Sequence, residues 1–213
     1  MQRDLTIRCD LRSVKQNKFA FFPLAGNTRK LIAGMVVALL AVTIPKLVDG
    51  RGLPVQQGIR NFGQISEDLY RGAQPNEAGI LNLKRLGIKT IVNLRMTDDA
   101  WQPEATLAQA NGIIYTNVPF KGMGRPSEEQ IAAALGIIKN SPGPVFVHCQ
   151  YGCDRTGTII ACYRIQHDGW SSVEAMAEAR HYGMSWFERG MRSYVLDFSK
   201  KAKLTLAKVA TAN

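Results

Sequence analysis

Residues 148–157 read HCQYGCDRTG and place a thiol, a carboxylate and a guanidinium in one short loop. Five residues, among them Gly152, separate Cys149 from Arg155. The planar guanidinium of an arginine can hold two phosphate oxygens at once, and backbone N–H groups that converge in a loop can bind the others. The same positive field favours the ionised thiolate, which is the nucleophilic form of a cysteine. The spacing therefore predicts that Cys149 attacks a phosphate monoester and forms a phosphocysteine intermediate.

Two neighbouring residues strengthen this interpretation of the loop. Gly152 permits a positive φ, so that successive N–H groups can point at one anion. Thr156 follows the arginine and can donate its hydroxyl to the thiolate. The alternative is that Cys149 is a structural thiol buried at the end of a strand. The complete pattern HC-x-x-G-x-x-R-T-G, with a strand before it and a helix after it, favours catalysis over that alternative.

The loop must be positioned by the elements on either side of it. The apolar run at residues 144–149 predicts a strand, and residues 155–169 predict a helix. Ligands of α/β sheets bind at the carboxyl ends of strands, where the N–H groups at the start of the next helix attract anions. Elsewhere we expect strands at residues 69–75, 89–95 and 113–120, and helices at residues 76–87, 102–112, 127–140, 171–183 and 187–204. The alternation predicts an α/β fold with a central, mostly parallel sheet flanked by helices.

The composition limits the class of partner. The chain has 213 residues, of which 46% are hydrophobic and 21% charged, and its net charge of +10 favours anionic partners such as phosphorylated substrates or an acidic membrane surface. We expect no nucleic-acid partner, because there is neither a zinc-finger spacing nor a basic-aromatic pattern. The four cysteines and three histidines show no metal-ligand spacing, so we expect no metal and no cofactor. The sequence does not indicate an oligomeric state.

The first part of the chain is basic and then apolar. Residues 1–30 form a basic arm, and residues 31–48 form an apolar segment whose only charge is Lys46. As a helix this segment is about 27 Å long, close to the roughly 30 Å of a bilayer core. We expect a signal anchor that keeps the N-terminus in the cytoplasm and places the rest outside it. A cleaved signal peptide and a buried helix of a soluble cytoplasmic protein are the alternatives. Residues 49–62, rich in Gly, Pro and polar residues, predict a linker.

The loop HCQYGCDRTG resembles the phosphate-binding loop of the cysteine-dependent protein tyrosine phosphatase superfamily. The stretches LYRGAQPN, LGIKTIVNLR and ACYRIQHDGWSSVEAMAEAR extend the likeness to compact bacterial, plant and fungal members of its dual-specificity branch. The resemblance implies a phosphatase domain at residues 63–199, followed by a basic tail at residues 200–213. It implies that Cys149 is the nucleophile, that Arg155 holds the phosphate, that His148 orients the loop and that no metal is used. It also implies phosphate-binding amides at Gln150, Tyr151, Gly152, Cys153 and Asp154.

The proton donor for the leaving oxygen is harder to identify. Many superfamily members carry an aspartate about thirty residues before the cysteine, whereas the stretch NVPFKGMGRPS has no acid. Asp154 within the loop is the first candidate, as in members whose loop ends in DRT. Asp98 and Asp99, which follow the strand IVNLRM, are the second. The third alternative is that a good leaving group needs no acid.

The predicted activity is hydrolysis of phosphate monoesters, with phosphorylated proteins as the first substrate class. Phosphoinositides, inositol polyphosphates and other anionic phosphoesters are alternative substrates. A phosphate-binding module without turnover, and sulfur or arsenate chemistry on a similar loop, are alternative functions. Cys153 and Cys162 could protect Cys149 through a reversible disulfide, although small buried packing is the commoner role of such cysteines.

Overall fold

The computed structural model describes residue 55 and residues 58–212, with side chains up to residue 204. The predicted arm and apolar segment therefore lie outside the described residues. The elements follow one another in the order β1 (Gly63–Ser66), β2 (Leu69–Ala73), α2 (Glu77–Arg85), β3 (Thr90–Asn93), α3 (Pro103–Ala110), β4 (Ile114–Asn117), α4 (Glu128–Asn140), β5 (Val145–Cys149), α5 (Asp154–His167), α6 (Ser172–His181) and α7 (Arg189–Ala212).

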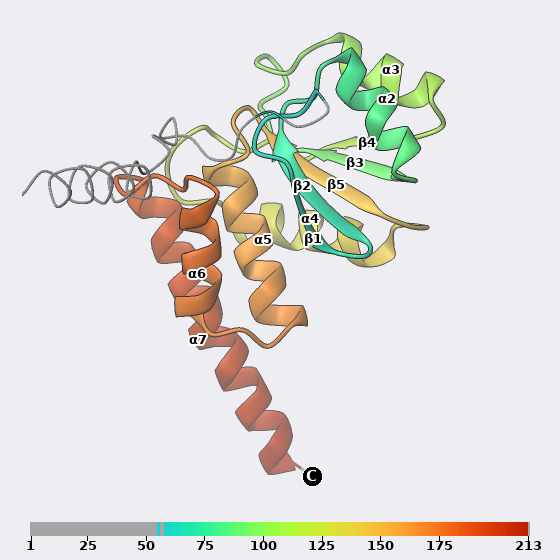
Figure 1. The fold of residues 1–213 in the computed structure, drawn as a ribbon. Coiled ribbons are helices and arrows are strands. Elements are labelled where there is room, and N and C mark those ends of the chain that lie inside the picture. Colours follow the sequence, from blue (N-terminus) through green and yellow to red (C-terminus); the bar gives the residue numbers. More distant parts are fainter. Residues whose placement is uncertain (1–54, 56–57, 213) are drawn as a thin grey trace, which may run out of the picture. The chain divides into compact units, whose positions relative to one another are not determined.

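One five-stranded sheet, in the order β1-β2-β5-β3-β4, forms the centre of this unit (Figure 1). The strand β1 runs antiparallel to β2, and all other neighbours are parallel. Each parallel pair needs a long crossover, which the helices supply. The register pairs Ala73 and Asn93 with the last two residues of β5, so three strands end at the same edge as Cys149. The prediction of an α/β fold with a mostly parallel sheet is confirmed.

Helices cover both faces of the sheet. In Figure 1, α2 and α3 lie on one face, and α4, α5, α6 and α7 lie on the other. The face under α2 and α3 contributes a small apolar cluster around Ile91 and Phe146. The other face contributes a larger cluster around Val147, Ile159 and Ile160. Because β5 is buried along its whole length between these two clusters, the loop that follows it has a rigid base.

Two predicted helix starts have the capping interactions that their sequences indicate. The side chain of Asn76 accepts a hydrogen bond from the backbone N–H of Gly79 at the start of α2. Ser127 and Gln130 form a reciprocal capping box at the start of α4. Such caps satisfy backbone donors that the first helical turn leaves without partners.

Three features differ from the expectations. The strand β1 was not predicted, because its four residues GQIS carry no clear apolar alternation. Ile59 and Asn61 fall in the predicted linker but are fully buried, so the folded unit begins before residue 63. The helix α7 continues through the predicted basic tail to Ala212.

Within residues 58–212, no helix combines the length and the apolar character needed to cross a bilayer.

Candidate active site

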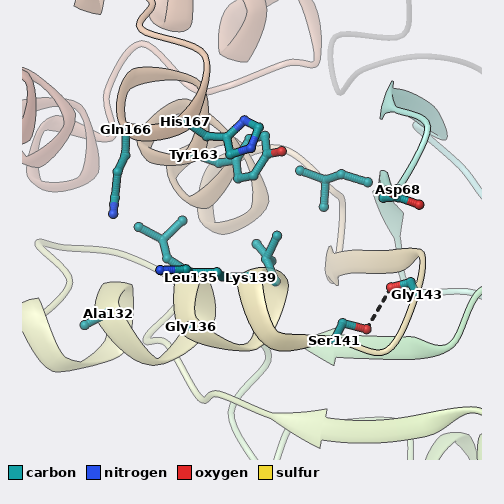
Figure 2. A pocket seen from close by; sticks show the side chains of 12 residues that line it. Asp68, Ala132, Leu135, Gly136, Lys139, Ser141, Gly143, Tyr163, Gln166 and His167 are labelled. Carbon is teal, nitrogen blue, oxygen red and sulfur yellow. Dashed lines mark hydrogen bonds between the residues drawn. The ribbon is translucent and has the colours of Figure 1, made fainter.

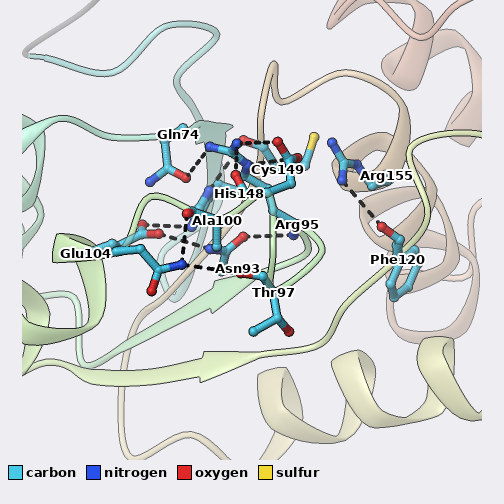
Figure 3. Close-up of polar contacts among 12 residues, drawn as sticks. Gln74, Asn93, Arg95, Thr97, Ala100, Glu104, Phe120, His148, Cys149 and Arg155 are labelled. Carbon is cyan, nitrogen blue, oxygen red and sulfur yellow. Dashed lines mark hydrogen bonds and ion pairs between the residues drawn. The ribbon is translucent and has the colours of Figure 1, made fainter.

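The predicted catalytic loop joins the end of β5 to the start of α5. Cys149 is the last residue of β5 and is 3% exposed, and Arg155 lies in the first turn of α5 and is 6% exposed. Figure 3 shows the Cys149 side chain and the Arg155 guanidinium pointing toward one another. Gly152 has φ +68°, and a Cβ built on it would lie 2.5 Å from the carbonyl oxygen of Gly72. Only glycine fits both the backbone conformation and this close approach.

A second arginine, Arg71 of β2, lies behind the loop and is fully buried. Its Nη2 donates a hydrogen bond of 2.6 Å to the carbonyl oxygen of Gly152, and its guanidinium stacks 3.9 Å from the ring centre of Tyr182. Burial lowers the pKa of Arg71 to about 10, although the nearby ionisable groups of Tyr182, Glu178 and Cys149 raise it. Arg71 is therefore a protonated cation at neutral pH and adds a second positive charge beneath the loop.

Asn61 fixes the same stretch of loop from another side. Its amide nitrogen lies within hydrogen-bonding distance of the carbonyl oxygens of Tyr151, Gly152 and Tyr182, at 3.1, 3.0 and 2.9 Å. In a trans peptide the C=O and the following N–H point in opposite directions. Because Asn61 and Arg71 hold the carbonyls of residues 151 and 152, the N–H groups of Gly152 and Cys153 must point away from them, as an anion-binding loop requires.

Arg155 has few partners in the described part of the chain. Its Nη1 lies 3.4 Å from the carbonyl oxygen of Phe120, and it forms no ion pair with the described residues. A buried guanidinium without a carboxylate partner is costly unless an anion binds to it. The predicted phosphate would be such an anion.

Asp154, the first candidate acid, has both carboxylate oxygens engaged. Oδ1 accepts a hydrogen bond of 2.7 Å from the backbone N–H of Ser185, and Oδ2 accepts one of 3.2 Å from its hydroxyl. Ser185 lies in the segment between α6 and α7. These two bonds anchor that segment to the start of α5.

Asp99, a second candidate, is held by Arg95, which follows β3. The two side chains form a salt bridge of 2.8 Å. In Figure 3, Nη1 of Arg95 donates a hydrogen bond of 3.1 Å to Oε1 of Gln74. The backbone N–H of Gln74 in turn donates to the carbonyl oxygen of Gln150 in the loop. The hydrogen bond from Arg95 lowers the pKa of Asp99, and the charge of Arg155 lowers it further. Asp99 thus lies within the electrostatic reach of Arg155, whereas Asp98 is exposed in the turn before it.

His148 is fixed by a buried acid that sequence reasoning missed. Its Nε2 lies 2.9 Å from Oε1 of Glu104, and both side chains are fully buried. The two atoms are at the distance of an ion pair, but they are not aligned as a hydrogen bond. Neither atom has a hydrogen-bonding partner among the described residues. Glu104 also accepts 3.0 Å from Asn93. Acidic residues are common in the first turn of helices, where they favour the helix itself. Nothing in the sequence therefore distinguished Glu104 as a residue of the active site.

Arg71 and Asn61 were also missed. Arg71 could have been noticed, because an arginine within the otherwise apolar strand LYRGA is rarely buried without a specific partner. Asn61 had none, since it lies in a stretch with the composition of a linker. The predicted bond from Thr156 to the thiolate is not formed in this structure, because the Thr156 hydroxyl is buried without a partner among the described residues.

The other cysteines differ in their surroundings. Cys153 is buried beside Asn61, whose amide nitrogen lies 3.6 Å from its sulfur. Cys162 is fully buried within α5, and burial raises its pKa far above the ordinary value. A thiol in that state is a poor nucleophile. Cys149, Cys153 and Cys162 are all reduced, and in the described residues no His, Cys, Asp and Glu side chains gather as a metal site.

A cavity of about 660 Å³ lies away from this loop, between α4 and α5 (Figure 2). Lys139 and Leu135 face Tyr163 and His167 across it. It is at the opposite end of β5 from Cys149, where the N–H of Val145, the first residue of that strand, bonds the carbonyl oxygen of Asp68. No cysteine lines it, so the predicted chemistry belongs to the loop and not to this cavity.

Comparison with known proteins agrees with the geometry of the loop. Residues 54–195 match the family model described as "DSP-PTPase phosphatase fused to NAD+ Kinase". The dual specificity protein phosphatase TpbA of Pseudomonas aeruginosa is 32% identical over 126 residues, which cover 58% of this chain and 55% of TpbA. The phosphatidylglycerophosphate phosphatase PTPMT2 of Arabidopsis thaliana is 27% identical over 130 residues, which cover 59% of this chain and 57% of that protein.

The chain thus spans about half the length of these curated relatives. Among solved structures, a crystal structure of P. aeruginosa TpbA in complex with pTyr has 28% sequence identity and a TM-score of 0.58. The match covers 74% of this chain and 98% of that one.

Proposed function

The chain belongs to the DSP-PTPase family, and on that premise we propose that it hydrolyses phosphate monoesters through a phosphocysteine on Cys149. Phosphotyrosine, phosphoserine and phosphothreonine of proteins are the proposed substrates. The observation that carries the proposal is the pairing of a buried thiol with a buried arginine that has no ion-pair partner among the described residues, at one end of β5. The likeness to TpbA, a dual specificity protein phosphatase, supports the substrate class.

The proposed reaction has two steps. In the first, the Cys149 thiolate attacks phosphorus, the bond to the ester oxygen breaks, and that oxygen leaves with a proton. Arg155 and the N–H groups of Gly152 and Cys153 hold the three phosphoryl oxygens as their charge is redistributed. In the second step, water attacks phosphorus and the sulfur leaves as thiolate. The products are the alcohol and inorganic phosphate.

For the proton donor, we propose Asp99 and not Asp154. Asp154 already accepts two hydrogen bonds from Ser185, so its role is to position that segment. Asp99 is also paired, with Arg95, but its side chain is 45% exposed and lies within reach of the charge of Arg155. The hydrogen bond and charge of Arg95, with a smaller contribution from Arg155, lower the pKa of Asp99 in the free protein. A bound phosphate dianion would offset the charge of Arg155 and add negative charge nearby, and both effects raise the pKa of the Asp99 carboxyl toward the protonated form.

The experiment that tests this function compares an aryl phosphate with an alkyl phosphate. We expect the parent to release phosphate from both, and Cys149→Ser to release none from either. Rapid quenching of the parent followed by mass spectrometry should detect phosphate on the Cys149 peptide. If the parent turns over neither ester, the proposed activity is wrong and a binding module is the better interpretation.

The same pair of substrates separates the two acids. An aryl leaving group needs little protonation, so loss of the true acid should reduce alkyl phosphate turnover by roughly 10²-fold or more while sparing aryl phosphate. We expect this pattern for Asp99→Asn. Asp154→Asn should lower both activities together, because it loosens a segment beside the loop. The reverse result would return Asp154 to the acid role.

For location, we propose that residues 31–48 anchor the protein in a membrane, with the N-terminus in the cytoplasm. The apolar character of the segment and the basic residues before it support this proposal. Retention in the membrane pellet after alkaline extraction, together with protection of the N-terminal arm from external protease, would agree with it. Release into the supernatant would contradict it.

A further inference from the structure

Asp154 and Arg155 are adjacent in sequence but contact two different segments of the chain. Asp154 holds Ser185, which precedes α7. Arg155 contacts the carbonyl of Phe120, which follows β4. The two residues therefore fix two segments at the border of the catalytic loop. We call residues 120–125 and 185–189 together the mouth rim.

The two segments of the mouth rim also contact one another. Oε1 of Glu188, which is 3% exposed, accepts a hydrogen bond of 3.0 Å from the backbone N–H of Gly124. A Cβ built on Gly190, the residue that follows the second segment, would lie 2.4 Å from the backbone nitrogen of Arg125. Such an approach is open only to glycine, so the segments are packed directly against each other beside the active site.

The mouth rim exposes large apolar side chains. Met123, Trp186 and Phe187 are 66%, 78% and 53% exposed, and the two aromatic rings lie edge to face with centroids 5.9 Å apart. Most of each side chain stands out from the protein. Exposed apolar side chains gathered at a functional site indicate a surface that binds another protein or a membrane.

The exposed charged side chains of the two segments are all basic. Lys121, Arg125 and Arg189 are exposed in the same two segments, and the only acid there is the buried Glu188. Arg125 forms a salt bridge with Asp197 of α7, outside the rim. Aromatic side chains surrounded by lysine and arginine are typical of surfaces that enter the headgroup region of anionic bilayers.

We propose that the mouth rim docks on an anionic lipid bilayer and presents the active site to the phosphate monoester of a lipid headgroup. This inference rests on the proposed phosphatase activity and adds a second substrate class, lipid phosphate monoesters, to the phosphoproteins proposed above. A peptide-binding surface would need a recess for anchoring side chains. The hollow lined by the first segment of the rim, from Phe120 to Arg125, measures about 190 Å³, below the roughly 300 Å³ at which small-molecule pockets begin. Protruding side chains suit insertion into lipid better than capture of a peptide.

The first test measures where Trp186 lies when the full chain is bound to vesicles. The chain has three tryptophans, Trp101, Trp170 and Trp186, and none of them lies in the apolar segment 31–48. Brominated phospholipids quench only tryptophans that enter the bilayer. We expect vesicles of brominated phosphatidylcholine and phosphatidylserine to quench the parent, and Trp186→Phe to lose the quenchable emission. Equal quenching of parent and variant, or none in the parent, would overturn the docking.

The second test compares activity on phosphatidic acid in phosphatidylserine-containing vesicles with activity on a soluble aryl phosphate. Truncating both rings in Trp186→Ala/Phe187→Ala should lower the ratio of vesicle to soluble activity by roughly tenfold or more, because two interfacial side chains are lost. The matched control is Val173→Ser, which removes an apolar residue 76% exposed at the start of α6, and it should leave the ratio unchanged.

Each outcome of the second test has one interpretation. No turnover of the aryl phosphate by the parent would contradict the phosphatase function itself. Aryl turnover with an unchanged ratio in the double variant would contradict only the docking. Vesicle activity that falls equally in Val173→Ser would show that general surface hydrophobicity, and not the mouth rim, drives binding. A phosphopeptide that outcompetes the vesicles, with its turnover lowered by the double variant, would assign the rim to a peptide partner instead.

Discussion

The two ends of α5 each carry an arginine, and the two arginines differ in whether carboxylates pair with them. At the start, Arg155 is buried with one carbonyl contact and no ion pair among the described residues. At the other end, Arg164 bonds Asp168 at 2.7 Å and Glu178 at 2.8 Å and stacks over Trp170. The carboxylates raise the pKa of Arg164 against the effect of burial.

This difference separates a functional charge from a structural one. Arg164 is satisfied within the protein and joins α5 to α6, so its interactions contribute to stability. Arg155 and the buried Arg71 have no such carboxylate partner in the described part of the chain, and their burial opposes folding unless an anion is bound. A cation that costs stability persists where function requires it. Substitutions at the two ends should therefore move activity and stability in different proportions.

The largest expected effect comes from removing the functional cation of α5. Arg155→Met should lower kcat/KM for an aryl phosphate by roughly 10³-fold, because the buried site loses its main oxyanion-stabilising donor. Its free energy of unfolding in urea should stay equal or rise, since an unpaired buried charge is removed. Inorganic phosphate should raise the melting temperature of the parent and not that of the variant. A strongly destabilised Arg155→Met would break the distinction between the two ends.

The second prediction concerns Arg71, which acts from behind the loop. Arg71→Met should lower kcat by roughly 10- to 100-fold, because the Gly152 carbonyl loses its donor and the loop N–H groups lose their fixed direction. Stability should change by no more than about 1 kcal/mol, as the removed desolvation cost offsets the lost hydrogen bond. A positioning role predicts that phosphate also binds more weakly, which calorimetry would show. Unchanged activity would reduce Arg71 to a packing residue.

The same distinction explains which parts of the site and the fold could be predicted from the sequence. The catalytic loop is a local sequence pattern that contains Cys149, Gly152 and Arg155, so it could be predicted. The helices and strands around it could also be predicted, from the spacing of apolar residues. Arg71, Asn61 and Glu104 act through contacts with residues far away along the chain, such as the 91 positions between Asn61 and Gly152. No periodicity or spacing encodes such a contact. The role of Asp154 was obscured for the same reason, because its partner Ser185 follows 31 positions later.

The third prediction tests the structural end of α5. Arg164→Met should lower the free energy of unfolding by about 2 kcal/mol, because Asp168 and Glu178 remain partly buried without their partner. In a domain of this size the melting temperature should fall by roughly 6 °C. Aryl phosphate turnover at a temperature where the variant is folded should match that of the parent. The control Arg85→Met removes an exposed arginine of α2 and should change stability by less than about 0.5 kcal/mol.

The smallest expected effect is the pH dependence of the Arg164 cluster. Asp168 is partly buried, which raises its pKa, but the hydrogen bonds from Arg164 and His167 lower it more, so the net value lies below the ordinary 3.8. Between the two values the unfolded chain binds a proton that the native protein does not. The stabilisation by Asp168 is therefore complete above pH 3.8 and is lost as the pH falls through the native pKa.

Asp168→Asn should consequently be less stable than the parent by about 1 kcal/mol near neutral pH. Thermal melts at decreasing pH should show the gap between parent and variant narrowing below pH 3.8. Glu67→Gln, which changes an exposed acid without an ion pair among the described residues, should follow the parent throughout. A gap that stays constant into strong acid would mean that Asp168 stabilises α5 through its shape and not its charge. The structural end of the helix would then owe less to electrostatics than the functional end does.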